Sequence, residues 1–374
     1  MTGPSACPLC LRRPWLLAEL APFIENLVSL ERGRRVAELL ALSEADLAEA
    51  AAPRAGERIL AALDDLGEAG MRARLMNAGC WALCPHDASF PAALGELGDP
   101  PITLVGKGDP AVLRRAVPEA SVTIVGARRA SAYGRLVAAD LARSLAGAGM
   151  VVISGLAYGI DGAAHRGALE SGATLAVLGC GADVAYPAAH RGLHRRVVEE
   201  GAVVSEIAPG QGPWRWMFPA RNRIMAGLAG MTVVAEARER SGSLITATFA
   251  QELGRDVGAV PGPVTSPSSD GPNGLLAAGA CVVRDARDVL DAMLGAGAAA
   301  VAIAGPALEP WLAEALGCFE RSDGSCDALA REMGVPLGPA AVALSRLELL
   351  GYVEGSAVGT YTRTPLKPPA PLPS

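Results

Sequence analysis

The sequence predicts an α/β fold: a parallel sheet flanked by helices, with a smaller region on either side of it along the chain. Short apolar runs rich in β-branched residues recur through the middle of the sequence, and each ends in glycine, serine or charged residues. Helical apolar spacing often follows such a run, and this alternation is typical of parallel sheets. Before residue 80 the helical spacing occurs without such runs.

Residues 1–82 are predicted to form a small helical domain. Helical spacing covers residues 15–30, 35–42 and 58–77, and Ser43 with Asp46 is typical of a capped helix start. A helix-hairpin-helix in this region would hold a DNA backbone through turn amides. The region carries more acidic than basic residues and has no clear glycine hairpin, so packing or protein interaction is the favoured interpretation.

Residues 83–291 are predicted to form the core, an extended Rossmann-like sheet. The run at 121–125 ends at Gly126-Ala127-Arg128, and a helix is expected from residue 136. Strand, glycine turn and helix start present backbone N–H groups to a phosphate, and an arginine fork binds the same group. Because the carboxyl ends of parallel strands meet at one edge, we expect a phosphate site there, with Arg128 first.

The last part of the chain has a separate pattern. Residues 292–306 are rich in alanine and glycine and are predicted to be a linker. Residues 307–364 predict three helices, near 310–319, 327–333 and 339–350, and then two short strands, which is the order of a winged helix. The third helix offers one arginine against one glutamate, so duplex binding and protein contact both stay open. The proline-rich residues 365–374 are predicted to be disordered.

Composition limits the ligands that the chain can bind and the cellular compartment in which we expect it. The formal net charge is −6 over 374 residues, so nucleic-acid binding would need a focused basic patch. No uninterrupted apolar run of about 20 residues occurs, which predicts no membrane span. Eight cysteines without a secretory signal predict a cytoplasmic protein with reduced thiols.

The cysteines raise the question of a metal. Cys7 and Cys10 form a Cys-x-x-Cys pair, and Cys80 and Cys84 form a looser one, whereas a zinc site needs four well-placed ligands. Incidental cysteines on a frayed N-terminal segment are the favoured interpretation. We therefore predict no metal and no cofactor.

Three motifs carry a family resemblance: Ser-Gly-Leu-Ala-Tyr-Gly-Ile-Asp-Gly-Ala-Ala-His at 154–165, Phe-Pro-Ala-Arg-Asn-Arg-Ile at 218–224 and Ser-Gly-Ser-Leu-Ile-Thr-Ala at 241–247. Together they resemble the DprA/Smf family of DNA-processing proteins over about residues 85–290. The resemblance implies a cytosolic, non-catalytic protein that binds and protects single-stranded DNA. It also implies a homodimer through the core, near residues 257–280, and a partner, the RecA recombinase, loaded during natural transformation.

The same resemblance, with the strand-end argument, gives the expected DNA-binding residues. They are Gly126, Ala127, Arg128, Ser154, Gly155, Arg191, Arg221, Asn222, Arg223, Gly242, Ser243 and Thr246. One departure from the family pattern stands after Tyr186-Pro187, where Ala188 and His190 replace a basic residue and an asparagine. Arg191, Arg195 and Arg196 follow within two helical turns and are the candidates to supply the missing charge, with Arg191 counted among the expected DNA-binding residues. We also hypothesise that His190 tightens binding at low pH, if it approaches a phosphate.

Several interpretations compete. Of Arg221 and Arg223, one is expected to bind phosphate while the other holds a carboxylate such as Glu206 or Glu236. Those two carboxylates also leave open an alternative function, a nucleotide-binding enzyme of the phosphoribohydrolase type.

Two further side-chain pairs are ambiguous. His165 and Asp161 invite a catalytic interpretation, although a structural role is favoured. Trp214 and Trp216 either pack or stack on bases, and packing is slightly favoured.

Overall fold

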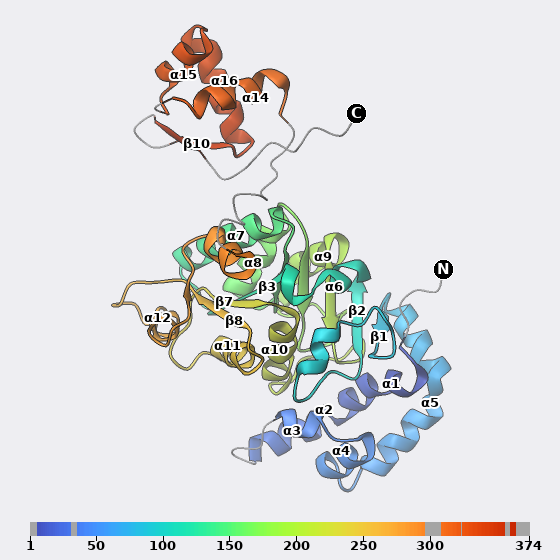
Figure 1. The fold of residues 1–374 in the computed structure, drawn as a ribbon. Helices are drawn as coiled ribbons and strands as arrows, with labels where there is room; N and C mark the ends of the chain where they lie inside the picture. The colour runs from blue at the N-terminus through green and yellow to red at the C-terminus, as the bar shows by residue number, and fades with distance from the viewer. Residues whose placement is uncertain (1–5, 31–35, 296–307, 323, 356–359, 364–374) are drawn as a thin grey trace. The chain divides into compact units, whose positions relative to one another are not determined.

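The computed structural model describes residues 6–30, 36–295, 308–322, 324–355 and 360–363. They fall into two compact units, residues 1–295 and 296–374, each taken here by itself (Figure 1). Most of the predicted linker and the whole predicted tail lie outside the described residues. Within the described ranges, no helix is long and apolar enough to cross a membrane.

A mixed nine-stranded sheet forms the centre of the first unit. The strands lie in the order β1-β2-β6-β5-β4-β3-β7-β8-β9. Their bounds are β1 Trp81–Leu83, β2 Leu104–Gly108, β3 Ser121–Val125, β4 Val151–Ser154, β5 Thr174–Val177, β6 Ala202–Ser205, β7 Met231–Val234, β8 Asp256–Ala259 and β9 Cys281–Val282. The expectation of an all-parallel sheet was wrong in one respect. Strand β2 runs antiparallel to both its neighbours, and the pairs from β6 to β9 are parallel.

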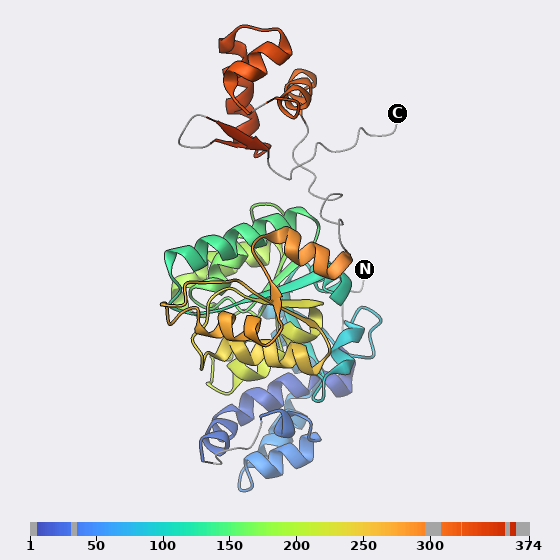
Figure 2. The same cartoon turned by 60° about the vertical axis from the view of Figure 1, so that its left-hand side comes forward.

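Helices cover both faces of the sheet. Helices α7 and α8 pack together on one face and α10 and α11 on the other, with α9 and α13 joining the first group (Figures 1 and 2). The helices of this part are α6 Pro110–Arg115, α7 Ala132–Gly147, α8 Ile160–Ala168, α9 Arg191–Glu200, α10 Met217–Leu228, α11 Gly242–Glu252, α12 Asp270–Ala277 and α13 Ala286–Leu294. Three 3₁₀ turns add to them: η1 Ala92–Glu96, η2 Pro118–Ala120 and η3 Ala188–His190.

The strand order reverses between β3 and β7. From β3 the chain proceeds to β4, β5 and β6 on one side, and from β7 it proceeds to β8 and β9 on the other. Strands β3 and β7 are hydrogen-bonded neighbours in parallel register, with Val122 opposite Met231. In open α/β sheets a ligand binds outside the carboxyl ends of the strands at such a switch point. The fold therefore directs the search for a site to the loops that follow β3 and β7.

The N-terminal helices belong to the same compact unit as the sheet. They are α1 Pro8–Leu11, α2 Arg13–Leu30, α3 Val36–Leu40, α4 Glu44–Ala51 and α5 Gly56–Asn77. Ser43 caps α4 by accepting from the Asp46 amide at 3.2 Å, as predicted. Trp216 lies 3% exposed in a core shared with α2, and its Nε1 donates to the Ala21 carbonyl at 3.1 Å. Trp216 thus packs and is closed to bases.

The segment that carries Cys7 and Cys10 is not frayed, so this expectation from the sequence was wrong. Cys7 is the residue before α1, and the Leu11 amide donates to its carbonyl at 2.9 Å. Cys10 and Leu11 are buried, and the Thr103 hydroxyl donates to the Cys10 carbonyl at 2.5 Å. The segment is therefore fixed against the core from Ala6 onward.

The described residues of the second unit form three helices and a two-stranded antiparallel sheet. The elements are α14 Pro310–Phe319, α15 Cys326–Met333, α16 Leu337–Leu349, β10 Val353–Gly355 and β11 Tyr361–Arg363. Leu344 and Leu347 of α16 are buried with Tyr352 in its core. The element order agrees with the sequence pattern, and the winged-helix interpretation stays a prediction. Arg346 of α16 lies 3.4 Å from Glu309, so its charge is paired.

Candidate functional site

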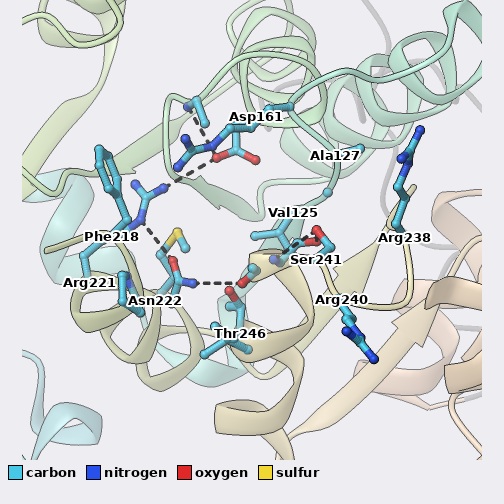
Figure 3. A pocket seen from close by; sticks show the side chains of 18 of the residues that line it. Val125, Ala127, Asp161, Phe218, Arg221, Asn222, Arg238, Arg240, Ser241 and Thr246 are labelled. Carbon is cyan, nitrogen blue, oxygen red and sulfur yellow. Dashed lines mark hydrogen bonds and ion pairs between the residues drawn. The ribbon is translucent and has the colours of Figure 1, made fainter. Parts of the chain in front are cut away.

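A cleft of about 980 Å³ opens at the switch point, outside the carboxyl ends of β3 and β7. Its walls come from the loop after β3, the start of α10 and the loop that leads from β7 into α11. Figure 3 shows Phe218, Arg221 and Asn222 on the α10 side, with Arg238 and Arg240 reaching out from the opposite loop. The cleft thus lies at the edge of the sheet where the sequence predicts a phosphate site, at the carboxyl ends of the parallel strands.

Arg128 is an exposed cation on the wall of this cleft. Its guanidinium lies over the Phe218 ring, 4.9 Å from the ring centre, and the Phe218 and Tyr186 rings are 5.6 Å apart. An arginine that stacks on an aromatic ring through its flat face keeps its N–H groups, which point outward in the plane of the guanidinium, free for an anion. Tyr186 is 39% exposed, so the cleft offers an aromatic face beside the charge.

Five exposed arginines line the cleft. They are Arg128, Arg129, Arg215, Arg238 and Arg240. None of them forms an ion pair with a carboxylate of the described chain. The single carboxylate among the lining residues is Asp161, which is buried. Unpaired guanidinium groups around a hollow focus a positive potential, although the whole chain is acidic.

Arg221 also lines the cleft, yet it is 7% exposed and its N–H groups are largely used. Its Nη1 donates to the carbonyls of Val177 and Gly155, the latter at 2.7 Å, and its Nη2 lies 3.8 Å from Asp161. Burial lowers the pKa of Arg221 and raises the pKa of Asp161, since each charged form loses water. Arg221 joins the loops at the ends of β4 and β5 and presents an edge to the cleft.

Gly155 and Ser154 support this arrangement without lining the main cleft. A Cβ on Gly155 would lie 2.0 Å from the Arg221 guanidinium, so glycine makes the room that Arg221 occupies. Gly155 borders a smaller hollow of about 80 Å³ that shares Arg128 and Tyr186 with the main cleft. The Ser154 hydroxyl is buried and donates to the Ile124 carbonyl at 2.6 Å, so it is not available to a ligand.

The prediction that Arg223 contacts phosphate is not supported by its position. Arg223 is 1% exposed, with Nη1 2.6 Å from Glu206 Oε2 and Nε 2.7 Å from Asp99 Oδ2. Because Arg223 lies two positions after Arg221 on α10, its side chain points to the other side of the helix. Of the two arginines, Arg223 is therefore the one that holds Glu206, whereas Arg221 lines the cleft beside Asp161.

The start of α11 forms the opposite wall. Ser241 caps the helix, and its Oγ lies 2.7 Å from Ser243 Oγ. Asn222 reaches across from α10 and donates to the Gly242 carbonyl at 3.2 Å. Thr246 lines the cleft, is fully buried, and its hydroxyl has no hydrogen-bond partner in the structure. A buried hydroxyl without a partner is costly for stability.

The remaining predicted residues take different places. Gly126 and Ala127 line the cleft as expected, but the Ala127 amide already donates to the Glu236 carbonyl at 2.6 Å. A Cβ on Gly126 would lie 2.7 Å from the same carbonyl, so close packing of the β3 and β7 loops requires glycine. Arg191 begins α9, is exposed, and is not among the lining residues.

The carboxylates and histidines proposed for acid–base work are engaged elsewhere. Glu206 binds Arg223, and Glu236 accepts from the Ser131 hydroxyl at 2.5 Å and from its amide at 2.8 Å. His165 is fully buried, bonds to Thr174 rather than Asp161, and has a pKa lowered by burial to about 3.

His190 faces inward as well. Its Nδ1 lies 3.0 Å from the Leu156 carbonyl, its ring packs edge-on against Tyr158, and it lies outside the main cleft. The hypothesis that His190 approaches a phosphate gains no support from this position.

Comparison with known proteins decides the family. The model of the family described as DNA recombination-mediator protein A matches residues 81–294, which contain the whole sheet and the cleft. The chain belongs to this family. The DprA/Smf resemblance read from the three motifs is thereby confirmed.

Relatives of the family are similar over the same part. The chain is 45% identical over 229 residues to a family relative from Mycobacterium tuberculosis and 43% identical over 205 residues to the DNA processing protein DprA of Streptococcus pneumoniae. These matches cover 58% and 54% of this chain, and 58% and 71% of the two relatives. The chain thus spans little more than half the length of the first relative.

Solved structures of the family have the same fold. The X-ray structure of DprA from Streptococcus pneumoniae aligns at a TM-score of 0.60 and 33% identity, over 76% of this chain and 98% of that one. A structure of DNA processing protein A from Helicobacter pylori aligns at a TM-score of 0.50 and 31% identity, over 55% and 92%. The Helicobacter structure is described for its single-stranded DNA binding mode.

Sequence reasoning missed three of the exposed arginines of the cleft, Arg215, Arg238 and Arg240. Arg238 and Arg240 follow β7 directly, and a charged loop between a buried strand and the next helix start was the available signal. Arg215 stands between two tryptophans, which drew attention to the rings instead. In the structure all three line the same cleft as Arg128.

Proposed function

We propose that the cleft binds single-stranded DNA by its phosphates and performs no bond chemistry. The observation that carries this proposal is the set of five exposed arginines at the switch point, which have no carboxylate partner among the described residues. Arginine forks match phosphate oxygens, and each contact releases a counterion from the DNA. Ser243 and the exposed start of α11 add uncharged donors on the opposite wall.

Base contacts in this proposal are few and tolerant of sequence. Tyr186 and Phe218 provide one aromatic face beside Arg128, and unspecific single-strand binding combines such a face with a basic groove. The single-stranded DNA binding mode described for the Helicobacter pylori protein supports the same ligand class. We therefore expect tight binding to oligo-dT and weak discrimination among other unstructured sequences.

The cellular role follows from the family. We infer that the chain protects incoming single-stranded DNA and loads a RecA recombinase onto it in the cytoplasm, as a homodimer through the sheet core near residues 257–280. The description of the family as a recombination mediator supports this role. Its test is RecA filament assembly on DNA coated with single-strand binding protein, which the full chain should accelerate. Unchanged assembly with the chain bound would contradict loading.

The alternative of a nucleotide-hydrolysing enzyme has no observation in its favour. Such chemistry needs a positioned acid and base in the cleft. Among the described lining residues the one carboxylate is Asp161, which is buried beside Arg221.

Fluorescence anisotropy of labelled oligo-dT tests the DNA proposal. Arg128→Ala should weaken binding about tenfold at moderate salt, since a charge-assisted contact contributes about 1.5 kcal/mol or more. Arg195→Ala is the matched control, because Arg195 is an exposed arginine of α9 outside the cleft. Equal loss in both variants, or no binding by the wild type, would overturn the proposal.

A further inference from the structure

A cluster of metal-ligating side chains lies away from the cleft, at the N-terminal end of the chain. It consists of Cys7, Cys10, Cys84 and His86, whose ligand atoms all lie within 4.8 Å of one another. The His86 Nδ1 lies 3.4 Å from the sulfur of Cys7, 3.4 Å from that of Cys10 and 3.7 Å from that of Cys84. We propose that these four side chains bind one zinc ion.

The distances match the edges of a zinc tetrahedron. Bonds of about 2.3 Å to sulfur and about 2.0 Å to nitrogen, at the tetrahedral angle, place a sulfur and a nitrogen ligand about 3.5 Å apart. The three observed distances from His86 to sulfur scatter around this value. A disulfide would bring together two sulfurs and leave out the other two groups, whereas one imidazole nitrogen near three sulfurs indicates a shared centre. Three thiolates with one imidazole are typical of a closed structural zinc site.

Local structure brings the two halves of the cluster together. Cys7 stands at the cap of α1 and Cys10 lies three residues on, so both sulfurs face the same side of the first turn. Cys84 and His86 follow β1 directly, with Pro85 between them. The Cys7 amide donates to the Cys84 sulfur at 3.4 Å, so the two halves of the cluster are in direct contact.

Burial suits a structural ion with a path for entry. Cys10 is 8% exposed and Cys84 1% exposed, whereas Cys7 is half-buried and His86 exposed. Metal binding at such a cluster contributes directly to folding stability, because the unfolded chain has no assembled site. The ion would join α1 to the end of β1. Helices α2 to α5 lie between these two elements along the chain, so the ion would link both ends of this helical segment.

This inference departs from the sequence prediction of no metal. That prediction paired Cys84 with Cys80, its neighbour along the chain. In the structure the Cys80 sulfur donates to the Ala78 carbonyl at 3.7 Å and stands outside the cluster, and His86 takes the fourth position. None of the four ligands lines the DNA cleft, so the zinc proposal and the DNA proposal fail or succeed independently.

The test measures zinc in the full chain, expressed with added zinc and purified without chelators. Elemental analysis should give one zinc per chain in the wild type and at least a fivefold loss in Cys10→Ser and His86→Ala. His86→Cys should keep the ion, since it restores four ligands, and Cys80→Ser is the matched control that should also keep it. Zinc far below one per wild-type chain, or full retention in Cys10→Ser, would overturn the proposal.

Cobalt substitution keeps the proposal testable if a cysteine variant fails to fold. Wild-type chain stripped of metal and titrated with Co²⁺ should show strong tetrahedral bands and a sulfur-to-metal charge-transfer band, saturating at one equivalent. Chelator should also lower the melting temperature of the wild type and of Cys80→Ser alike. Weak octahedral bands, or a melting temperature indifferent to chelator, would overturn the assignment.

Discussion

Arg223 and Glu206 form a two-pronged ion pair inside the protein, with Nη1 2.6 Å from Oε2 and Nη2 2.8 Å from Oε1. Glu206 follows β6, and Arg223 lies in the middle of α10. The Arg223 Nε lies 2.7 Å from Asp99, so one guanidinium holds two carboxylates from separate segments. The pair fixes α10 on the sheet and thereby places Phe218 and Arg221 at the cleft.

Replacing Arg223 should therefore cost stability. Arg223→Ala leaves two buried carboxylates without their cation, and breaking a buried pair in this way costs about 3–5 kcal/mol. Urea denaturation should show a lower midpoint for Arg223→Ala and an unchanged midpoint for Arg128→Ala, whose side chain is exposed. An unchanged midpoint with lost DNA binding in Arg223→Ala would return this residue to the DNA-binding set.

The salt dependence of binding should report which arginines meet phosphate. Each phosphate contact on a single strand contributes about 0.7 to the slope of log affinity against log salt. Arg238 and Arg240 line the cleft, so Arg238→Ala and Arg240→Ala should each reduce that slope by about 0.7. Arg191→Ala, an exposed arginine outside the cleft, should leave the slope unchanged. The reverse pattern would favour the original prediction for Arg191 over the position that the structure gives it.

What the sequence could predict was mostly local. Strand, turn and helix follow each other along the chain, so Arg128 and Ser243 could be placed at the sheet edge from residue types alone. The choice between Arg221 and Arg223 could not be made in this way. Both lie on one helix, and only the packing of α10 decides which one faces the cleft and which faces Glu206.

Long-range relations were the ones that the sequence left hidden. The direction of β2 depends on a pairing with β6, about a hundred residues away in sequence. Cys7 and Cys84 are 77 positions apart, and nothing local in either segment indicates that they meet. Sequence spacing alone favours a pair of Cys84 with nearby Cys80, whereas in the fold Cys84 lies beside Cys7 and Cys10 at the start of α1.

Removing the unpartnered Thr246 hydroxyl tests whether this side chain contacts a ligand or only packs in the core. Thr246→Val removes an orphaned polar atom while keeping shape, so stability should stay the same or rise. If the hydroxyl meets DNA, oligo-dT affinity should fall about threefold to tenfold. Thr232→Val is the matched control, because Thr232 in β7 also has a buried, unpartnered hydroxyl but does not line the cleft. Equal affinity in both variants would remove Thr246 from the site.

His165 gives the protein a predictable dependence on pH. Thr174 donates its hydroxyl proton to the Val152 carbonyl, so His165 Nδ1 must carry the proton in their 2.7 Å contact. Burial, as the largest cause, and the nearby charges of Arg221, His190 and Arg166 together lower the pKa of His165 to about 3. The neutral ring is therefore the form that the fold accepts.

The sign of the effect follows from the two pKa values of His165. In the unfolded chain His165 titrates near its ordinary pKa of about 6.5, so below that pH the unfolded state binds a proton that the folded state refuses. The stability from the neutral ring is complete above about pH 6.5 and falls by about 1.4 kcal/mol per pH unit on acidification, down to about pH 3. The free energy of unfolding from urea denaturation should therefore differ between pH 7 and pH 5 by about 2 kcal/mol more in the wild type than in His165→Asn, whose amide can still donate to Thr174. The same difference in both proteins would show that another group controls this range.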